Sequence, residues 1–220
     1  MRTHRYVPLS LSVLALSALL SGCAGSPPAH FYTLQTAPQA VSPDARRAGF
    51  QIEIAPVSVP LQADQPQIML REHEGDGALA PLYSHRWSAP LSDEIGAGLS
   101  DVLTSTLGAL NVQTLGTANN APVWRVQVDV QRFDMVAGGP ARLDATWRVR
   151  PINLKGAGTL MCRTAVQMPA DGLSIPALVQ AQQRAVALMA QTIASAIESG
   201  GVRATPAGQQ VLLWDCNQQG

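Results

Sequence analysis

Residues 125–131 read Arg-Val-Gln-Val-Asp-Val-Gln, and residues 142–150 read Arg-Leu-Asp-Ala-Thr-Trp-Arg-Val-Arg. In both stretches an apolar side chain alternates with a polar one, and successive side chains of a strand point to opposite faces of its sheet. The alternation predicts two antiparallel strands with one dry face and one wet, charged face. Gly138-Gly139-Pro140 supplies the turn between them, and Gly156-Ala157-Gly158 leads into a third strand at 159–168. The three strands are expected to form a meander.

Two amphipathic stretches predict helices that cover the apolar side of this sheet. From residue 90 to about 109, apolar side chains recur at three- and four-residue steps behind two acidic residues of the first turn. A second apolar stripe runs from about 175 to 198, with Ser174 as its N-cap and Gly200 as its stop. The expected fold is therefore α+β, a mostly antiparallel sheet with two helices packed on one face.

Shorter extended segments are predicted before the first helix. Residues 31–34, 50–54 and 67–71 have the composition and alternation of strands, and Pro56 ends the second of them. A polar, glycine-containing turn follows the third, and residues 79–83 are interpreted as the returning strand of a hairpin.

The chain divides into four regions. Residues 1–22 begin with basic residues and continue as a short apolar run, the layout of a signal peptide rather than of a membrane span. Residues 23–30 are a small, proline-containing tether, and residues 31–199 form one domain. Residues 200–220 are a tail, whose cluster Val211-Leu212-Leu213-Trp214 is expected to add an edge strand or to dock on the core.

The signal peptide ends in Leu20-Ser21-Gly22-Cys23, which resembles the lipobox of bacterial lipoproteins. Cys23 would then carry the lipid and be the first residue of the mature protein. Two or more acyl chains anchor a protein stably, whereas one holds only marginally. In lipoproteins of this kind an aspartate after the cysteine commonly retains the protein at the inner membrane, so Ala24 favours the outer membrane. The alternative is an ordinary secretory signal cut near Ala24.

The full chain holds 15 basic and 15 acidic residues, and loss of the signal peptide leaves the mature part close to neutral. This balance does not favour nucleic acid as a partner. With Cys23 lipidated, Cys162 and Cys216 remain in an oxidising compartment, where disulfides persist. We expect a Cys162–Cys216 disulfide; the alternative is that Cys162 is a buried free thiol and Cys216 lies loose near the C-terminus.

A search for catalytic and metal sites finds no candidate. The mature histidines, His30, His73 and His85, have no metal-ligand spacing, and the acidic cluster around His73 (Glu72, Glu74 and Asp76) is interpreted as a solvated turn. The sequence lacks a nucleophile elbow, a phosphate-binding loop and a dinucleotide fingerprint. We therefore expect no metal, no cofactor and no catalytic residue.

The aspartates of the predicted strands could suggest acid–base chemistry, but a structural interpretation is simpler. Asp129 and Asp144 fall on the polar strand face together with Arg125, Arg142 and Arg148. Opposite charges on neighbouring strands are typical of cross-strand ion pairs.

The order of several short motifs resembles that of the ABC-transport auxiliary lipoproteins of Gram-negative bacteria, the PqiC-like family. After the lipobox these are Phe31-Tyr32-Thr33-Leu34, Ile54-Ala55-Pro56-Val57, Pro66-Gln67-Ile68-Met69-Leu70-Arg71 and Arg86-Trp87-Ser88-Ala89-Pro90-Leu91, followed by 126–133 and 178–197. The resemblance spans residues 20 to about 199 and does not include the tail.

The resemblance implies a non-catalytic outer-membrane lipoprotein that partners an ABC or Pqi-type system, whose periplasmic MCE-domain protein carries lipids between the two membranes. Arg71, Arg86 and Trp87 are candidate partner contacts, because Trp and Arg are enriched at interface hot spots; the alternative places Trp87 in the core. A homo-oligomer is left open. The rival functions are a stand-alone lipoprotein that binds a lipid in its own pocket and an enzyme of unknown type.

Overall fold

The computed structural model describes residues 27–36, 48–75, 77–116 and 120–219. The predicted signal peptide and Cys23 lie outside the described residues, as does Asp76. Along the chain the elements are β1 (His30–Tyr32), β2 (Gln51–Ile54), β3 (Gln67–Arg71), β4 (Ala80–Trp87), α2 (Leu91–Leu107), β5 (Val123–Val136), β6 (Ala141–Ile152), β7 (Thr159–Met168), α3 (Ile175–Glu198) and β8 (Val211–Gln219).

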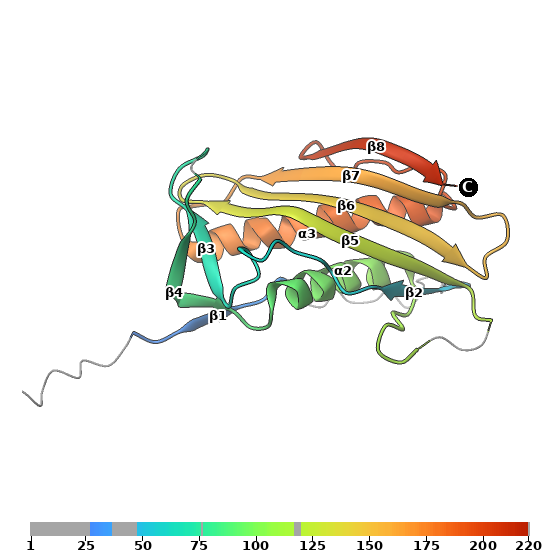
Figure 1. The fold of residues 1–220 in the computed structure, drawn as a ribbon, viewed down its shortest axis with the longest axis horizontal. Helices are drawn as coiled ribbons and strands as arrows, with labels where there is room; N and C mark the ends of the chain where they lie inside the picture. The colour runs from blue at the N-terminus through green and yellow to red at the C-terminus, as the bar shows by residue number, and fades with distance from the viewer. Residues whose placement is uncertain (1–26, 37–47, 76, 117–119, 220) are drawn as a thin grey trace, which may run out of the picture.

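All eight strands belong to one sheet, in the order β1-β4-β3-β5-β6-β7-β8, with β2 also paired to β5 (Figure 1). The pairs β3–β4, β5–β6, β6–β7 and β7–β8 are antiparallel. The pairs β1–β4, β2–β5 and β3–β5 are parallel. The α+β class and the mostly antiparallel sheet are thus confirmed, although the parallel pairs were not predicted.

The edge of β5 pairs with the segment that runs from β2 to β3. β2 pairs with residues 123–126 at the start of β5, and β3 pairs with Met135 and Val136 at its end. Between them Ser58 forms a parallel bridge with Asp129. One long strand therefore carries β2 near one end of the molecule and β3, β4 and β1 near the other (Figure 1).

The alternating apolar residues of β5, β6 and β7 are buried on one face of the sheet, as their spacing predicted. The helix α3 runs behind these three strands in Figure 1, and its apolar stripe belongs to the same core. Trp147 is fully buried there, and its indole Nε1 donates to Thr164 Oγ1 at 2.8 Å. This bond satisfies two polar groups that would otherwise be costly to bury.

The helices form where their sequence signals lie. α3 begins after Ser174, whose side chain accepts from the Ala177 N–H, and a left-handed Gly200 follows its end. α2 ends at Gly108, also in the left-handed conformation. Within α2, Gly98 lets α3 approach, because a Cβ there would lie 3.1 Å from Val186 Cγ1. α2 packs on α3 and contacts β2. The prediction that α2 covers the same sheet face as α3 stays a prediction.

Two predicted ranges, that of the strand at 79–83 and that of the domain, end too early. The strand expected at 79–83 extends to Trp87, because beyond an irregularity in the β3 pairing it continues beside β1. In the tail, of the two outcomes left open, the structure has the edge strand. Residues 211–219 form β8, antiparallel to β7, so the sheet extends beyond the domain boundary placed at residue 199.

Candidate interaction surface

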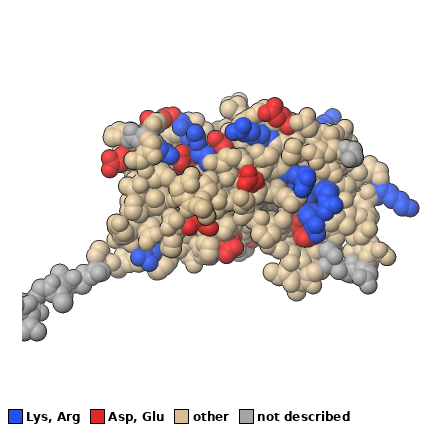
Figure 2. Space-filling view, in the orientation of Figure 1, with Lys and Arg blue, Asp and Glu red and all other residues tan. Residues whose placement is uncertain are grey.

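The second face of the sheet carries the polar residues of β5, β6 and β7. It is the face turned toward the viewer in Figures 1 and 2, with α3 behind the strands. Figure 2 shows that its charged side chains gather in separate groups rather than spreading evenly. We define two groups on this face, one near β3 and one near β2.

The group near β3 is called the paired end. It consists of three arginines and three acidic residues: Arg71, Arg132, Arg142, Glu74, Asp134 and Asp144. Arg71 Nη2 donates to both carboxylate oxygens of Asp134, at 3.1 and 3.2 Å. Arg132 Nε lies 3.7 Å from a carboxylate oxygen of Asp134 and of Asp144, and Arg142 donates to Glu74. Positive and negative charges are balanced here.

The main chain beneath the paired end is fixed from the opposite side of the sheet. Gln182 of α3 is fully buried, and its Nε2 donates to the carbonyl oxygens of Asp134 at 2.8 Å and Arg142 at 3.2 Å. Burial raises the pKa of the Asp144 carboxyl above its ordinary value, against the opposing pull of the nearby Arg132. These contacts are those of a structural ion-pair network.

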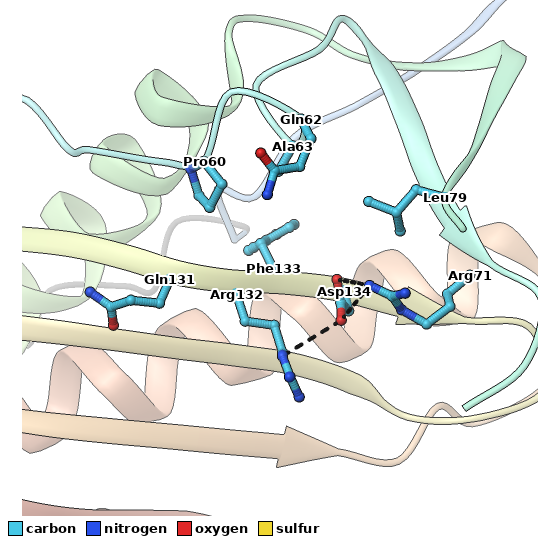
Figure 3. Close-up of a pocket in the computed structure, with 9 residues that line it drawn as sticks. All are labelled: Pro60, Gln62, Ala63, Arg71, Leu79, Gln131, Arg132, Phe133 and Asp134. Atoms are coloured by element: carbon cyan, nitrogen blue, oxygen red, sulfur yellow. Dashed lines mark hydrogen bonds and ion pairs between the residues drawn. The ribbon is translucent and has the colours of Figure 1, made fainter. Parts of the chain in front are cut away.

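A hollow at the paired end is small. Pro60, Gln62, Ala63 and Leu79 line it together with Arg71 and residues 131–134 (Figure 3). Its volume is about 100 Å³. Figure 3 shows Arg71 and Arg132 both turned to Asp134, so the hollow's charged groups are already engaged with one another.

The group near β2 is called the arginine end, and it consists of Arg125, Arg148 and Arg150 with Glu53. Arg125 and Arg150 are directly opposite in the β5–β6 register. Arg125 donates from Nε and Nη2 to Glu53 Oε2, at 3.1 and 2.9 Å. Arg148 donates to the neutral amide oxygen of Gln127, and Arg150 is exposed. Among the described residues no carboxylate forms an ion pair with Arg148 or Arg150.

A second, shallow hollow adjoins the arginine end. Its volume is about 280 Å³, and its lining includes Ala55, Pro56, Met161, Asp129 and Arg148. Small-molecule sites usually enclose about 300–1,000 Å³ and bury most of their ligand. Neither of these two hollows reaches that range. The arginine end is therefore better suited to contact a surface than to enclose a ligand.

The three predicted contact residues are not gathered on one surface. Arg71 belongs to the paired end, and Arg86 Nε lies 3.4 Å from the Tyr83 carbonyl oxygen. Trp87 is 4% exposed and stacks edge-on against Phe133. The prediction that Trp87 lies on a contact surface is thus wrong in this structure, because the indole fills the core before α2.

The histidines show no metal-site arrangement. His30 and His85 stack with ring centroids 5.3 Å apart, and the Tyr32 hydroxyl lies 2.9 Å from His85 Nδ1. Burial, followed by the proximity of His30, lowers the pKa of His85. Near His73, Glu74 is committed to Arg142. Within the described parts of the chain, no three His, Cys, Asp or Glu side chains are placed to share a metal ion.

The two cysteines of the folded part lie on neighbouring strands. The structure bonds Cys162 of β7 to Cys216 of β8. Beside this bridge the Arg163 guanidinium lies 5.3 Å from the Trp214 ring centroid. The tail is thereby held against β7.

Sequence reasoning missed the arginine end because it assigned the wrong pairs. Arg125 and Arg148 were expected to form cross-strand ion pairs with Asp129 and Asp144, whereas Arg125 pairs with Glu53 of β2. Asp144 pairs with Arg132, one residue past a register shift in β5. A signal was present, since Arg148 and Arg150 follow one another on the polar face with no acidic residue in the next polar position.

Among the helices of the described residues, none has the length and apolarity needed to cross a bilayer.

The sequence and the fold were compared with known proteins. The family model described as "ABC-type transport auxiliary lipoprotein component" matches residues 32–194. A solved structure of an uncharacterized protein is similar, with a TM-score of 0.61 and 14% identity, over 78% of this chain and 99% of its own. A Xanthomonas campestris protein assigned to the DUF330 family has a TM-score of 0.53 and 16% identity, over 78% and 96%. These two show a shared fold, and no curated protein matches.

Proposed function

Because the chain belongs to the family of ABC-type transport auxiliary lipoprotein components, we propose that it is a non-catalytic subunit of an MCE/Pqi-type system for lipid transport between the two membranes. Its task in that system is to bind and to position. The observation that carries the proposal is the family match over most of the folded domain.

The proposed place of the protein is the periplasmic side of the outer membrane. The lipobox supports acylation of Cys23, and Ala24 after it supports export beyond the inner membrane. Several acyl chains on one cysteine would make the anchor stable. Cys23 and His30 are seven positions apart, so the tether spans at most roughly 25 Å when fully extended. β1 would then stay close to the bilayer.

The proposed partner is the periplasmic MCE-domain protein of the same system. An open sheet face whose charges are unevenly matched supports a docking role. The alternative of a stand-alone lipid carrier draws no support from the two hollows, which are smaller than usual ligand sites. The Cys162–Cys216 disulfide is proposed to form in the oxidising periplasm, where it would hold β8 on the sheet.

The test is a crosslinked pull-down of the tagged, lipidated protein from separated inner and outer membranes, with Cys23→Ala as the control for location. We expect the wild-type protein in the outer-membrane fraction together with the MCE-domain protein, and the variant to be lost from the outer-membrane fraction. Recovery of bound lipid with no protein partner would instead support the stand-alone carrier. Recovery of wild type from the inner membrane would contradict the proposed location.

A further inference from the structure

Among the described residues, the arginine end has more basic than acidic side chains, and Arg148 and Arg150 form no ion pair there. We infer that this surface, Arg125, Arg148 and Arg150 on β5 and β6, docks an acidic segment of the periplasmic partner. The inference rests on the proposed function and deepens it, since it gives the partner's chemistry and the face that it meets.

The first argument is charge. Three guanidinium groups share this end of the face with two carboxylates. Glu53 is bonded to Arg125, and Asp129 lines the adjoining hollow and accepts a hydrogen bond from Gln131. Like charges directly opposite on neighbouring strands destabilise a sheet, and Arg125 and Arg150 are such a pair. Carboxylates of a partner placed between them would relieve this repulsion. Figure 2 shows the basic side chains gathered over this end of β5 and β6.

The second argument is geometry at the level of single side chains. The two hydrogen bonds from Arg148 to the Gln127 amide oxygen hold the guanidinium beside the shallow hollow. Because this acceptor is neutral, the positive charge of Arg148 is not neutralised by it. A planar guanidinium binds a carboxylate through two parallel hydrogen bonds. The apolar lining from Ala55, Pro56 and Met161 lies next to it. An extended peptide with acidic and small apolar residues fits this combination.

The third argument is orientation. β1, where the tether enters the domain, lies at the end of the long axis opposite to β2 in Figure 1. The two ends are linked by the 14 residues of β5, a length of roughly 40 Å. An anchor on Cys23 holds the β1 end near the outer membrane. The arginine end therefore points into the periplasm, from which a partner based in the inner membrane arrives.

The test compares two double variants with equal loss of charge on the same face. Arg148→Gln/Arg150→Gln removes two groups of the arginine end, whereas Arg132→Gln/Arg163→Gln removes two arginines elsewhere on the face. Full-length lipidated protein in neutral-lipid nanodiscs is titrated with the purified MCE-domain protein of the same system. Binding is followed by fluorescence anisotropy at low and high salt, and thermal unfolding confirms that both variants fold.

We expect the first variant to bind at least tenfold more weakly and with little remaining salt dependence, and the control to bind within about threefold of wild type, because exposed charges act mainly within a Debye length of about 10 Å. Equal binding by wild type and the first variant would overturn the inference while the proposed function stands. An equal loss in both variants would also overturn it. No binding by wild type would remove both proposals.

Vesicles containing phosphatidylglycerol provide the remaining control, because a phosphate headgroup offers the same anionic chemistry. We expect wild type and Arg148→Gln/Arg150→Gln to associate with them equally. If the variant loses vesicle binding and keeps binding to the protein partner, the arginine end is a headgroup site and the inference is overturned.

Discussion

The two ends of the open sheet face are built from the same strands and hold three arginines each, yet they differ in how those charges are met. At the paired end three carboxylates form ion pairs with the arginines, and Gln182 binds the main chain beneath them. At the arginine end a single carboxylate of the described residues, that of Glu53, forms an ion pair. The presence of charged side chains on a strand face therefore does not show whether they serve stability or binding, whereas the partner of each charged side chain does.

The comparison also separates structure from recognition. Partly buried, mutually satisfied ion pairs resist change, because removing one member leaves the other desolvated and unpaired. Replacing an exposed arginine that has no carboxylate partner changes the stability of the folded protein little. We therefore expect loss of the Arg71–Asp134 pair to lower stability, and changes at the arginine end to alter binding.

The largest expected effect comes from the disulfide that holds β8 beside β7. Cys162 is opposite Trp147 on the buried face of the sheet, and the next residue pair in the β6–β7 register is Arg148 with Met161. Replacing both cysteines by alanine opens a link between residues 54 apart. Chain entropy alone gives a loss of about 4 kcal/mol in the free energy of unfolding.

Urea unfolding under non-reducing conditions measures this loss, and hydrogen exchange locates it. Amides of β8 and of the neighbouring part of β7 should exchange faster, while those of β3 and the end of β5 should change little. A wild-type protein whose unfolding curve is unaffected by a strong reductant would contradict the prediction, and so would a uniform increase in exchange.

The second prediction breaks the paired end. Asp134→Asn removes a carboxylate that forms ion pairs with both Arg71 and Arg132; the Arg71 side chain is 17% exposed. Breaking a fully buried pair costs 3–5 kcal/mol, and partial exposure of Arg71 lowers our expectation to about 2 kcal/mol. Urea unfolding provides the measurement. Partner binding should stay unchanged, so a loss of binding with stability intact would reverse the roles that we assign to the two ends.

The third prediction makes the matching change at the arginine end. Glu53→Gln leaves Arg125 without its carboxylate, but the pair is 24–35% exposed, and such surface pairs are worth at most about 1 kcal/mol. The same change adds net positive charge to the arginine end. We expect a small drop in unfolding free energy and a tighter complex with the acidic partner in the anisotropy assay. Weaker binding would show that Glu53 itself contacts the partner.

Much of the fold could be predicted because its signals are local. The apolar stripe and the Ser174 cap predicted α3 at residues 175–198, alternation identified β5 and β6, and the glycine turn at 156–158 indicated β7. The family resemblance is confirmed by the match to residues 32–194. Cys23 stays a prediction, because it lies outside the described residues.

What escaped prediction depends on contacts between distant segments. The parallel pairing of β2 with β5 brings Glu53 to Arg125, 72 residues away, and no local pattern encodes that register. A register shift between Val130 and Arg132 moves Arg132 opposite Asp144, which changes the ion pairs of the whole face. Trp87 was placed on a surface by composition, whereas the packing of Phe133 against it decides its burial.

The last and smallest prediction concerns how the stability contributed by Asp144, at the paired end, depends on pH. Burial raises the pKa of Asp144, with Arg132 opposing, so the folded protein holds this proton more tightly than the unfolded chain. The contribution of Asp144 to stability therefore increases as the pH falls through its folded pKa and decreases as the pH rises through it. Asp144→Asn imitates the protonated form, and its ion pair with Arg132, at 3.7 Å and half-exposed, contributes little.

We therefore expect Asp144→Asn to be slightly more stable than wild type at pH 7, with the difference vanishing as the pH falls past the pKa of Asp144. Urea unfolding at a series of pH values measures the difference, and an NMR titration of the Asp144 carboxyl carbon gives the pKa directly. A pKa below the ordinary aspartate value would mean that the arginines outweigh burial. The attraction of the arginines for the Asp144 carboxylate would then exceed the cost of its burial, and Asp144→Asn would lower stability at pH 7.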